Sequence, residues 1–241
     1  HNLRGGNNNM TVVDKDIFLH HNLARHSLHS GRLGKNKAVA IIKEAQDYFE
    51  VQQTKNLKAI PLDILTLNAS DFNEHQVVVD STASLNVQNW LTVNPNIKNH
   101  SLYRAEIVHK GSLGILYKEG KDRNPRIDDL VNYTYFGALS YSEIEAWRQY
   151  DVNTELENLP VGLGCSSTTA LIADDDISFH AAIFSKLISE PTKVDEGYVY
   201  LSNRSNEFPY NVKSNLVKVK PFDNYTCIND KSWNIRMADG V

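Results

Sequence analysis

Carboxylates and cations gather in the first forty residues of the chain. Asp14 and Asp16 follow an apolar run at 10–13, and Arg25 and Lys37 come later. A short apolar run is typical of a buried parallel strand, and a carboxylate at its end can accept hydrogen bonds from both hydroxyls of a ribose. Arg25 is a planar cation suited to phosphate oxygens. Lys37 lies at the start of a predicted helix, where anions are attracted.

Taken one at a time, these residues have plainer explanations. Asp14 alone is a helix cap or loop acid, and Lys37 alone is a solvated surface lysine. Their order along the chain is what favours a nucleotide site: strand, Asp-x-Asp, NLxRH, GxxKA, amphipathic helix, strand, and then VVVDSTAS.

A second reactive candidate is Cys165, within the Gly-, Ser- and Thr-rich segment 162–169. A nearby helix N-terminus would stabilise its thiolate, although the acidic run at 174–176 would oppose this if it lies close. A free cysteine is usually a small buried apolar residue, but these neighbours make a poor core. An accessible thiol is therefore favoured at Cys165, and Cys227 is expected to be structural.

The elements that would position these side chains alternate along the first hundred residues. We predict strands at 10–13, 57–60 and 76–79, and helices at 33–49 and 84–91. The first helix has an apolar face formed by Ala38, Ile41, Ile42, Ala45, Tyr48 and Phe49. Alternating strands and helices are the pattern of a parallel α/β sheet.

The pattern changes after residue 100. Two strands at 104–109 and 112–117 are joined by Lys110-Gly111, a hairpin signal. Helices are predicted at 127–138, 142–148 and 175–188, a crossover loop at 151–164, and short strands at 198–202, 216–219 and 233–237. The expected fold class is α/β, with a Rossmann-like, mostly parallel sheet flanked by helices and antiparallel additions in the second half.

Composition narrows the classes of function. The chain is 41% hydrophobic and 22% charged, as in globular proteins with a core, and its net charge of -4 argues against a general nucleic-acid binder. No apolar run approaches the roughly 20 residues of a membrane span, and the polar first residues are not a signal peptide. We therefore expect a cytoplasmic protein. His20, His21 and His26 fit no standard zinc spacing.

Three stretches resemble the ThiF/MoeB/HesA superfamily of ubiquitin-activating-type adenylating enzymes. They are MTVVDKDIFLHHNLARHSLHSGRLGKNKA, QVVVDSTAS and GLGCSSTTALIADDDISFHAA. The resemblance is good over residues 1–90, and the combined NL-x-R-H and G-x-x-K-A spacing makes it specific. The ending SWNIRMADGV resembles, over a short stretch, the linker before a JAB-type isopeptidase in bacterial fusions.

This resemblance implies an ATP-dependent reaction in which the C-terminal carboxylate of a small protein attacks the α-phosphorus and expels pyrophosphate. The enzyme would contribute placement and electrostatic stabilisation. Asp14 would bind the ribose, with Asp16 beside it in the cofactor site. Asn22, Arg25 and Lys37 would contact the triphosphate, and Arg25 would also stabilise charge during catalysis. Magnesium would lie near Asp80.

The resemblance also implies partners and a second step. Cys165 would take the adenylated protein as a thioester. The partners would be a ubiquitin-like modifier and a conjugating enzyme in a bacterial conjugation system, and the enzyme would be a homodimer. Residues 1–100 would be part of a nucleotide-binding half, and 101–241 would complete the same adenylation domain.

Two departures from the family pattern leave alternatives open. The Gly-rich turn that follows the family's first strand would fall before His1, and Ala83 stands where many members have a magnesium-binding aspartate. Both departures favour a catalytically degenerate scaffold that binds a ubiquitin-like or partner protein. A nicotinamide-dependent oxidoreductase is a further alternative: Asp14 suits it, but Arg25 and Lys37 would have no role there.

Overall fold

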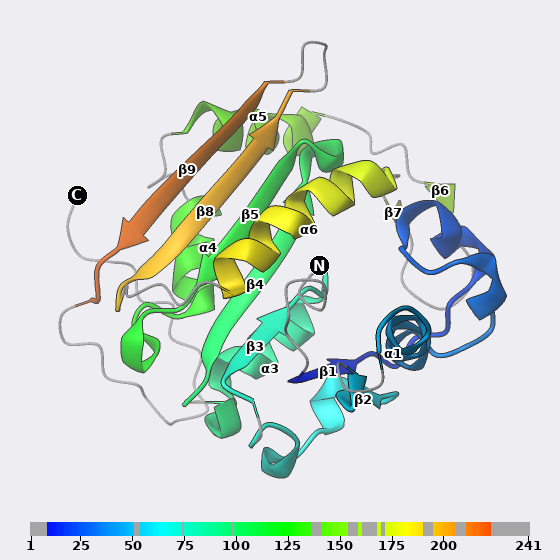
Figure 1. The fold of residues 1–241 in the computed structure, drawn as a ribbon. Helices are drawn as coiled ribbons and strands as arrows, with labels where there is room; N and C mark the ends of the chain where they lie inside the picture. The colour runs from blue at the N-terminus through cyan, green and yellow to red at the C-terminus, as the bar shows by residue number, and fades with distance from the viewer. Residues whose placement is uncertain are drawn as a thin grey trace.

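The computed structural model describes most of the chain and places helices on both faces of a mixed sheet (Figure 1). The described residues are 9–50, 54–73, 75–97, 99–135, 141–153, 159–160, 168–169, 172–189, 195–205 and 211–222. Cys165, Cys227 and the strand predicted at 233–237 lie outside these ranges.

The first unit is a parallel strand pair with its crossover helix. Strands β1 (Asn9–Val13) and β2 (Asn56–Ile60) pair in parallel, with Val13 opposite Ile60. Between them come η1 (His20–Arg25), η2 (Ser30–Arg32) and α1 (Lys37–Tyr48). Helix α1 buries Ala38, Ala40, Ile42 and Ala45. Tyr48, predicted on the apolar face, is instead 75% exposed at the end of the helix.

A second sheet contains strands in the order β3-β4-β5-β8-β9. The strands are β3 (Val77–Asp80), β4 (Ser101–Val108), β5 (Leu113–Lys118), β8 (Gly197–Arg204) and β9 (Val212–Val219). β3 pairs with β4 in parallel, after the crossover helix α3 (Leu85–Val93), and the remaining pairs are antiparallel. A two-residue pair, β6 (Leu159–Pro160) with β7 (Thr168–Thr169), stands apart.

Helices cover this sheet on both faces. In Figure 1, α6 (Asp174–Ser189) crosses the nearer face, and α4 (Ile127–Tyr135) and α5 (Ser142–Asn153) lie behind. Phe184 of α6 packs with Leu116 and Tyr198, while Leu130 of α4 joins the larger core on the other face. Short 3-10 helices lie at η3 (Ile64–Thr66), η4 (Ala69–Asp71), η5 (Pro95–Ile97), η6 (His109–Gly111) and η7 (Lys121–Arg123).

A buried histidine fixes α6 on the sheet. His180 is fully buried; its Nε2 donates to the Gly111 carbonyl at 2.9 Å, and its Nδ1 accepts from the Ser202 hydroxyl at 3.2 Å. Burial lowers the pKa of His180, which favours the neutral ring that this arrangement requires. The α6 helix is therefore held by polar contacts as well as by Phe184.

The predicted α/β class is confirmed, with parallel pairing in the first half and antiparallel strands in the second. The Lys110-Gly111 hairpin is also confirmed, since Gly111 adopts a φ of 91° between β4 and β5. The predicted start of the loop at residue 151 was wrong, because α5 continues to Asn153.

The parallel strands are divided differently from the expectation of one sheet. Among the described residues, β1 pairs only with β2, and β3 pairs only with β4. Val13 and Val78 nevertheless pack against the same core cluster. Because β3 belongs to the sheet of the second half, the boundary predicted at residue 100 falls between paired strands and stays a prediction. None of the described helices combines the length and apolar character needed to cross a bilayer.

Candidate functional site

Asp14 lies where β1 ends. Its backbone N–H extends the ladder by donating to the Ile60 carbonyl at 3.2 Å, and its Oδ1 accepts from the backbone of Asp16 at 2.8 Å. The side chain is half-buried, and no described residue donates a hydrogen bond to Oδ2. One carboxylate oxygen is therefore available at the carboxyl end of a parallel strand.

Backbone pairing brings the start of α1 to Asp14. Ile17 forms an isolated antiparallel bridge with Asn36, and the Phe18 N–H donates to the Lys35 carbonyl at 2.8 Å. The Lys37 N–H donates to the Asp16 carbonyl, also at 2.8 Å. The two ends of the loop between β1 and α1 are therefore hydrogen-bonded to each other.

Asn36 secures this closure with both ends of its amide. Its Nδ2 donates to the Asp14 carbonyl at 2.7 Å and to the Asp16 carbonyl at 3.2 Å. Its Oδ1 accepts from Val39 at 3.1 Å and so caps α1. The end of β1 and the N-terminus of α1 are thereby joined through a single side chain.

Lys37 lies beside Asp16 at this junction. Its Nζ is 3.2 Å from Asp16 Oδ2, and the two side chains are 16% and 35% exposed. The structure therefore pairs Lys37 with Asp16 and brings the start of α1 to the backbone of Asp14, while the nucleotide-binding roles of these residues stay predictions. Asp16 differs from its predicted role in one respect: it balances the charge of Lys37, so the pair presents less net positive charge than a free lysine.

Asn22 and Arg25 belong to η1. Asn22 is buried, and its side-chain oxygen Oδ1 accepts a hydrogen bond from the backbone N–H of Leu19 at 2.9 Å. This side chain therefore caps the start of η1, the helix that carries Arg25. The backbone of Arg25 closes η1, and its side chain lies outside the described part. The phosphate-binding roles of both residues stay predictions.

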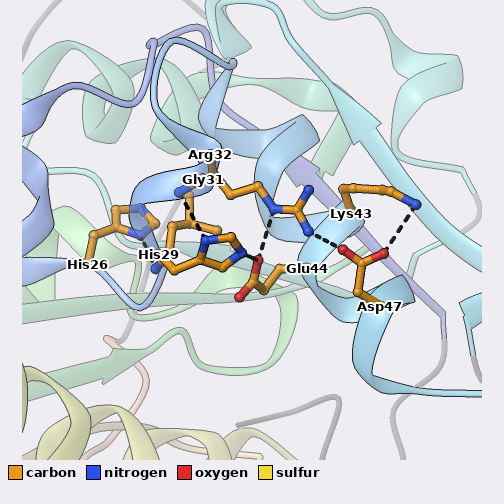
Figure 2. A network of polar contacts seen from close by, with 8 residues as sticks. His26, His29, Gly31, Arg32, Lys43, Glu44 and Asp47 are labelled. Carbon is orange, nitrogen blue, oxygen red and sulfur yellow. Dashed lines mark hydrogen bonds and ion pairs between the residues drawn. The ribbon is translucent and has the colours of Figure 1, made fainter.

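A network of ion pairs fastens the loop after η1 to the outer side of α1 (Figure 2). Arg32 bonds to Glu44 at 3.0 Å and also to Asp47, while His29 lies 3.2 Å from Glu44. Lys43 reaches the other oxygen of Asp47 at 3.2 Å. Hydrogen bonds from Arg32 and then Lys43 lower the pKa of Asp47, which keeps its carboxylate charged.

Asp80 occupies a different environment at the end of β3. Its side chain is 2% exposed and forms an ion pair with Arg104. Its Oδ1 accepts from the N–H of Thr82 at 2.8 Å and from the Thr82 hydroxyl at 2.7 Å. No hydrogen bond or ion pair among the described residues joins Asp80 to Asp14 or Lys37.

This environment does not fit the magnesium site predicted at Asp80. A magnesium ion needs carboxylate oxygens that can be reached from solvent or substrate, whereas both oxygens of Asp80 are engaged inside the core. The described ranges also contain no group of three His, Cys, Asp or Glu side chains arranged to hold a metal ion. The described contacts of Asp80 therefore give no support to a magnesium site there.

Comparison with known proteins gives only distant likenesses. No protein-family model and no curated protein matches the chain. The crystal structure of E. coli MccB matches with a TM-score of 0.48 and 16% identity, over 95% of this chain and 60% of MccB. The E. coli MccB structure with ATP gives 0.45 and 16%, over 88% and 56%.

A further structure, of the microcin C7 biosynthetic enzyme MccB with N-formylated MccA, gives a TM-score of 0.46 and 18% identity, over 88% of this chain and 58% of that one. This chain thus spans less than two thirds of the length of the MccB structures. A likeness at this level assigns no function, and the activity of a whole protein remains a proposal.

Sequence reasoning missed the role of Asn36, which organises the site, and the role of Arg104, which pairs with Asp80. Asn36 precedes an amphipathic helix, where asparagine is a preferred cap, so its capping role was readable. Its bonds to Asp14 and Asp16 depend on loop closure and were not. Arg104 stands between apolar residues of β4, with Glu106 two residues later. That spacing puts both on one face of a strand, but nothing in it identifies Asp80 as the partner.

Proposed function

We propose that this chain is part of an adenylating enzyme that uses ATP to activate the C-terminal carboxylate of a peptide or small protein. The observation that carries the proposal is the closure of α1 onto the carboxyl end of β1, where Asn36 bonds to Asp14 and Lys37 pairs with Asp16. Nucleotides bind at the carboxyl ends of strands in open α/β folds. The motifs NLxRH and GxxKA, which lie between the end of β1 and the first turn of α1, support ATP over other nucleotides through their resemblance to adenylating enzymes.

The available oxygen of Asp14 accepts from a ribose hydroxyl in this proposal. Lys37 Nζ turns one of its N–H donors toward a phosphate oxygen while Asp16 holds another. Arg25 binds the phosphates from the end of η1. The substrate carboxylate then attacks the α-phosphorus, the bond to pyrophosphate breaks, and the two cations stabilise the added negative charge.

The finer parts of the proposal rest on the resemblance alone. They are a ubiquitin-like modifier as the substrate, thioester formation on Cys165, transfer to a conjugating enzyme, a homodimer, and a bacterial conjugation system. Mass spectrometry of the full-length protein with ATP and a neighbouring ubiquitin-like protein tests the thioester, which Cys165→Ala should abolish while leaving adenylation intact.

Nucleotide binding tests the site itself. A fluorescent ATP analogue should bind the full-length protein, ATP should displace it, and NAD should not. Asp14→Asn and Lys37→Gln should each weaken binding about tenfold, the loss expected for one charged hydrogen bond. Lys35→Gln is the matched control, because Lys35 is an exposed lysine two residues away. Equal binding by all variants would refute the site, and displacement by NAD alone would favour the oxidoreductase.

A scaffold without catalytic activity is the second candidate. Its specific support is internal charge neutralisation, since Asp16 pairs with Lys37 and Arg104 pairs with Asp80. Pyrophosphate exchange by the full-length protein with a ubiquitin-like partner separates the two functions. Exchange supports the enzyme, and partner binding without exchange supports the scaffold.

A further inference from the structure

Arg104 is enclosed between two carboxylates in the interior of the protein. The residue is 4% exposed on β4; its Nη1 donates to Asp80 Oδ2, and its Nε donates to Glu106 Oε1 at 2.6 Å. Asp80 and Arg104 face each other directly across the parallel pairing of β3 with β4. Leu91, Leu102 and Ile127, together with the buried Gln88, surround them. In such a buried and largely apolar place, a carboxylate needs a cation or hydrogen bonds to stay charged.

Arg104 meets that need without any added ion. Burial alone would lower the pKa of Arg104, but the nearby carboxylates of Glu106 and Asp80 outweigh it and raise the pKa. The guanidinium therefore stays charged and donates to both acids. A carboxylate offers about four lone-pair sites, and Asp80 uses three of them, on Arg104 and on the N–H and hydroxyl of Thr82.

A series of hydrogen bonds links the Asp80–Arg104 pair to the start of α3. Asp80 accepts from Thr82, whose Oγ1 accepts from the Ser84 N–H at 3.4 Å. Ser84 Oγ in turn accepts from Val87 at 3.4 Å and caps α3. Arg104 thus stands at the head of a series of hydrogen bonds that sets the path from β3 into the following helix.

We infer that Arg104 is a positioning residue that replaces a metal ion at the carboxyl end of β3. It neutralises Asp80 and, through it, fixes residues 80–84 as they enter α3. Asp80 is then a structural anchor and not a magnesium ligand. The inference concerns only the described interior contacts and holds whether or not the chain binds ATP.

Manganese, a paramagnetic substitute for magnesium, tests the inference in the unmodified protein. An ion on Asp80 would broaden the backbone amide NMR signal of Thr82, which lies 2.8 Å from that carboxylate. We expect the Thr82 and Ser84 signals to persist as Mn²⁺ is added. Selective loss of these signals at low Mn²⁺ would overturn the inference, and this measurement requires no variant to fold.

Variants give an independent test. Arg104→Met leaves Asp80 and Glu106 together without a cation, so this variant should have a lower Tm than the wild type and should regain part of the loss with Mn²⁺. Arg104→Lys should recover part of the loss without metal. The matched control is Arg123→Met, which breaks the buried pair with Glu119 but leaves a single carboxylate, and its Tm should not respond to Mn²⁺. A wild-type Tm that rises with Mn²⁺ and an Asp80→Asn variant that does not respond would contradict the inference.

Discussion

The side-chain amide of Asn36 donates a hydrogen bond to the backbone carbonyl of Asp14 at 2.7 Å. The same asparagine caps α1, so a single residue sets the position of the helix that carries Lys37 relative to the carboxylate at the end of β1. A cap is ordinarily a local device. Here it also determines the geometry of the candidate nucleotide site.

Replacing Asn36 should therefore affect both stability and binding. Asn36→Ala removes the cap and the bonds to Asp14 and Asp16, and it should lower the free energy of unfolding by about 1–2 kcal/mol. Urea unfolding measures this loss. Asn36→Asp keeps a capping oxygen but removes the N–H donor. This variant should therefore be more stable than Asn36→Ala but should still bind ATP more weakly than the wild type. Full binding by the aspartate variant would show that the tie to Asp14 is unimportant.

His180 should make stability depend on pH. Burial lowers the pKa of His180 in the folded state, so near pH 6 the unfolded chain binds more protons than the folded one. Stability from this group is complete above its unfolded pKa of about 6.5 and is lost as the pH falls through the lower folded value. Urea unfolding across this window should show the loss.

The pH dependence can be assigned by substitution. His180→Gln should remove much of the fall in stability below neutral pH, although it lowers stability at every pH. His21→Gln is the control, since His21 is exposed on η1. An unchanged pH profile in the His180 variant would contradict the assignment.

Gly114 should not tolerate a side chain. A Cβ at this position on β5 would meet the His180 ring and would lie 2.9 Å from Phe184 Cζ. Gly114→Ala should therefore push α6 from the sheet and cost about 1–3 kcal/mol, as overpacking of a core usually does. Thermal unfolding measures the effect. If crowding is the cause, adding Phe184→Leu should reduce the penalty, and strictly additive losses would argue against it.

The ion pairs of Arg32 should contribute a stabilisation that depends on salt. Arg32→Met removes the contacts to Glu44 and Asp47 that fasten the loop to α1. We expect a small loss of stability at low salt that shrinks in about 1 M NaCl, where the screening length is only about 3 Å. Unfolding of both proteins at the two salt concentrations checks this. A difference independent of salt would indicate that packing of the Arg32 side chain dominates.

Local patterns predicted the elements well, because they depend on periodicity and turn residues. The helix predicted at 175–188 is α6, one residue longer at each end, and Lys110-Gly111 does join two antiparallel strands. The order of motifs predicted that Asp14, Arg25 and Lys37 converge on one nucleotide, and this stays a prediction. The closure of α1 onto the end of β1 could not be predicted, because the Ile17–Asn36 bridge is a contact between distant residues that no local pattern encodes.

The pairing of Asp80 was missed for the same reason. A carboxylate at the end of a strand was expected near magnesium, and the sequence around it offered no sign of Arg104, which lies 24 residues away and meets Asp80 only through strand pairing. Arg104 and Asp80 become neighbours only when β3 pairs with β4 in the folded chain. The burial of both residues then follows from their mutual neutralisation.

The outer edges of β1 and β3 have one more consequence. Each carries a row of backbone donors and acceptors that no described strand satisfies, and such edges recruit extended polypeptide. Val77 and Val79, 37% and 42% exposed on β3, add apolar surface beside that row. Self-association through β-strand addition is thus a hazard for any preparation in which these edges stay open, and a strand bound there would shield the valines from water.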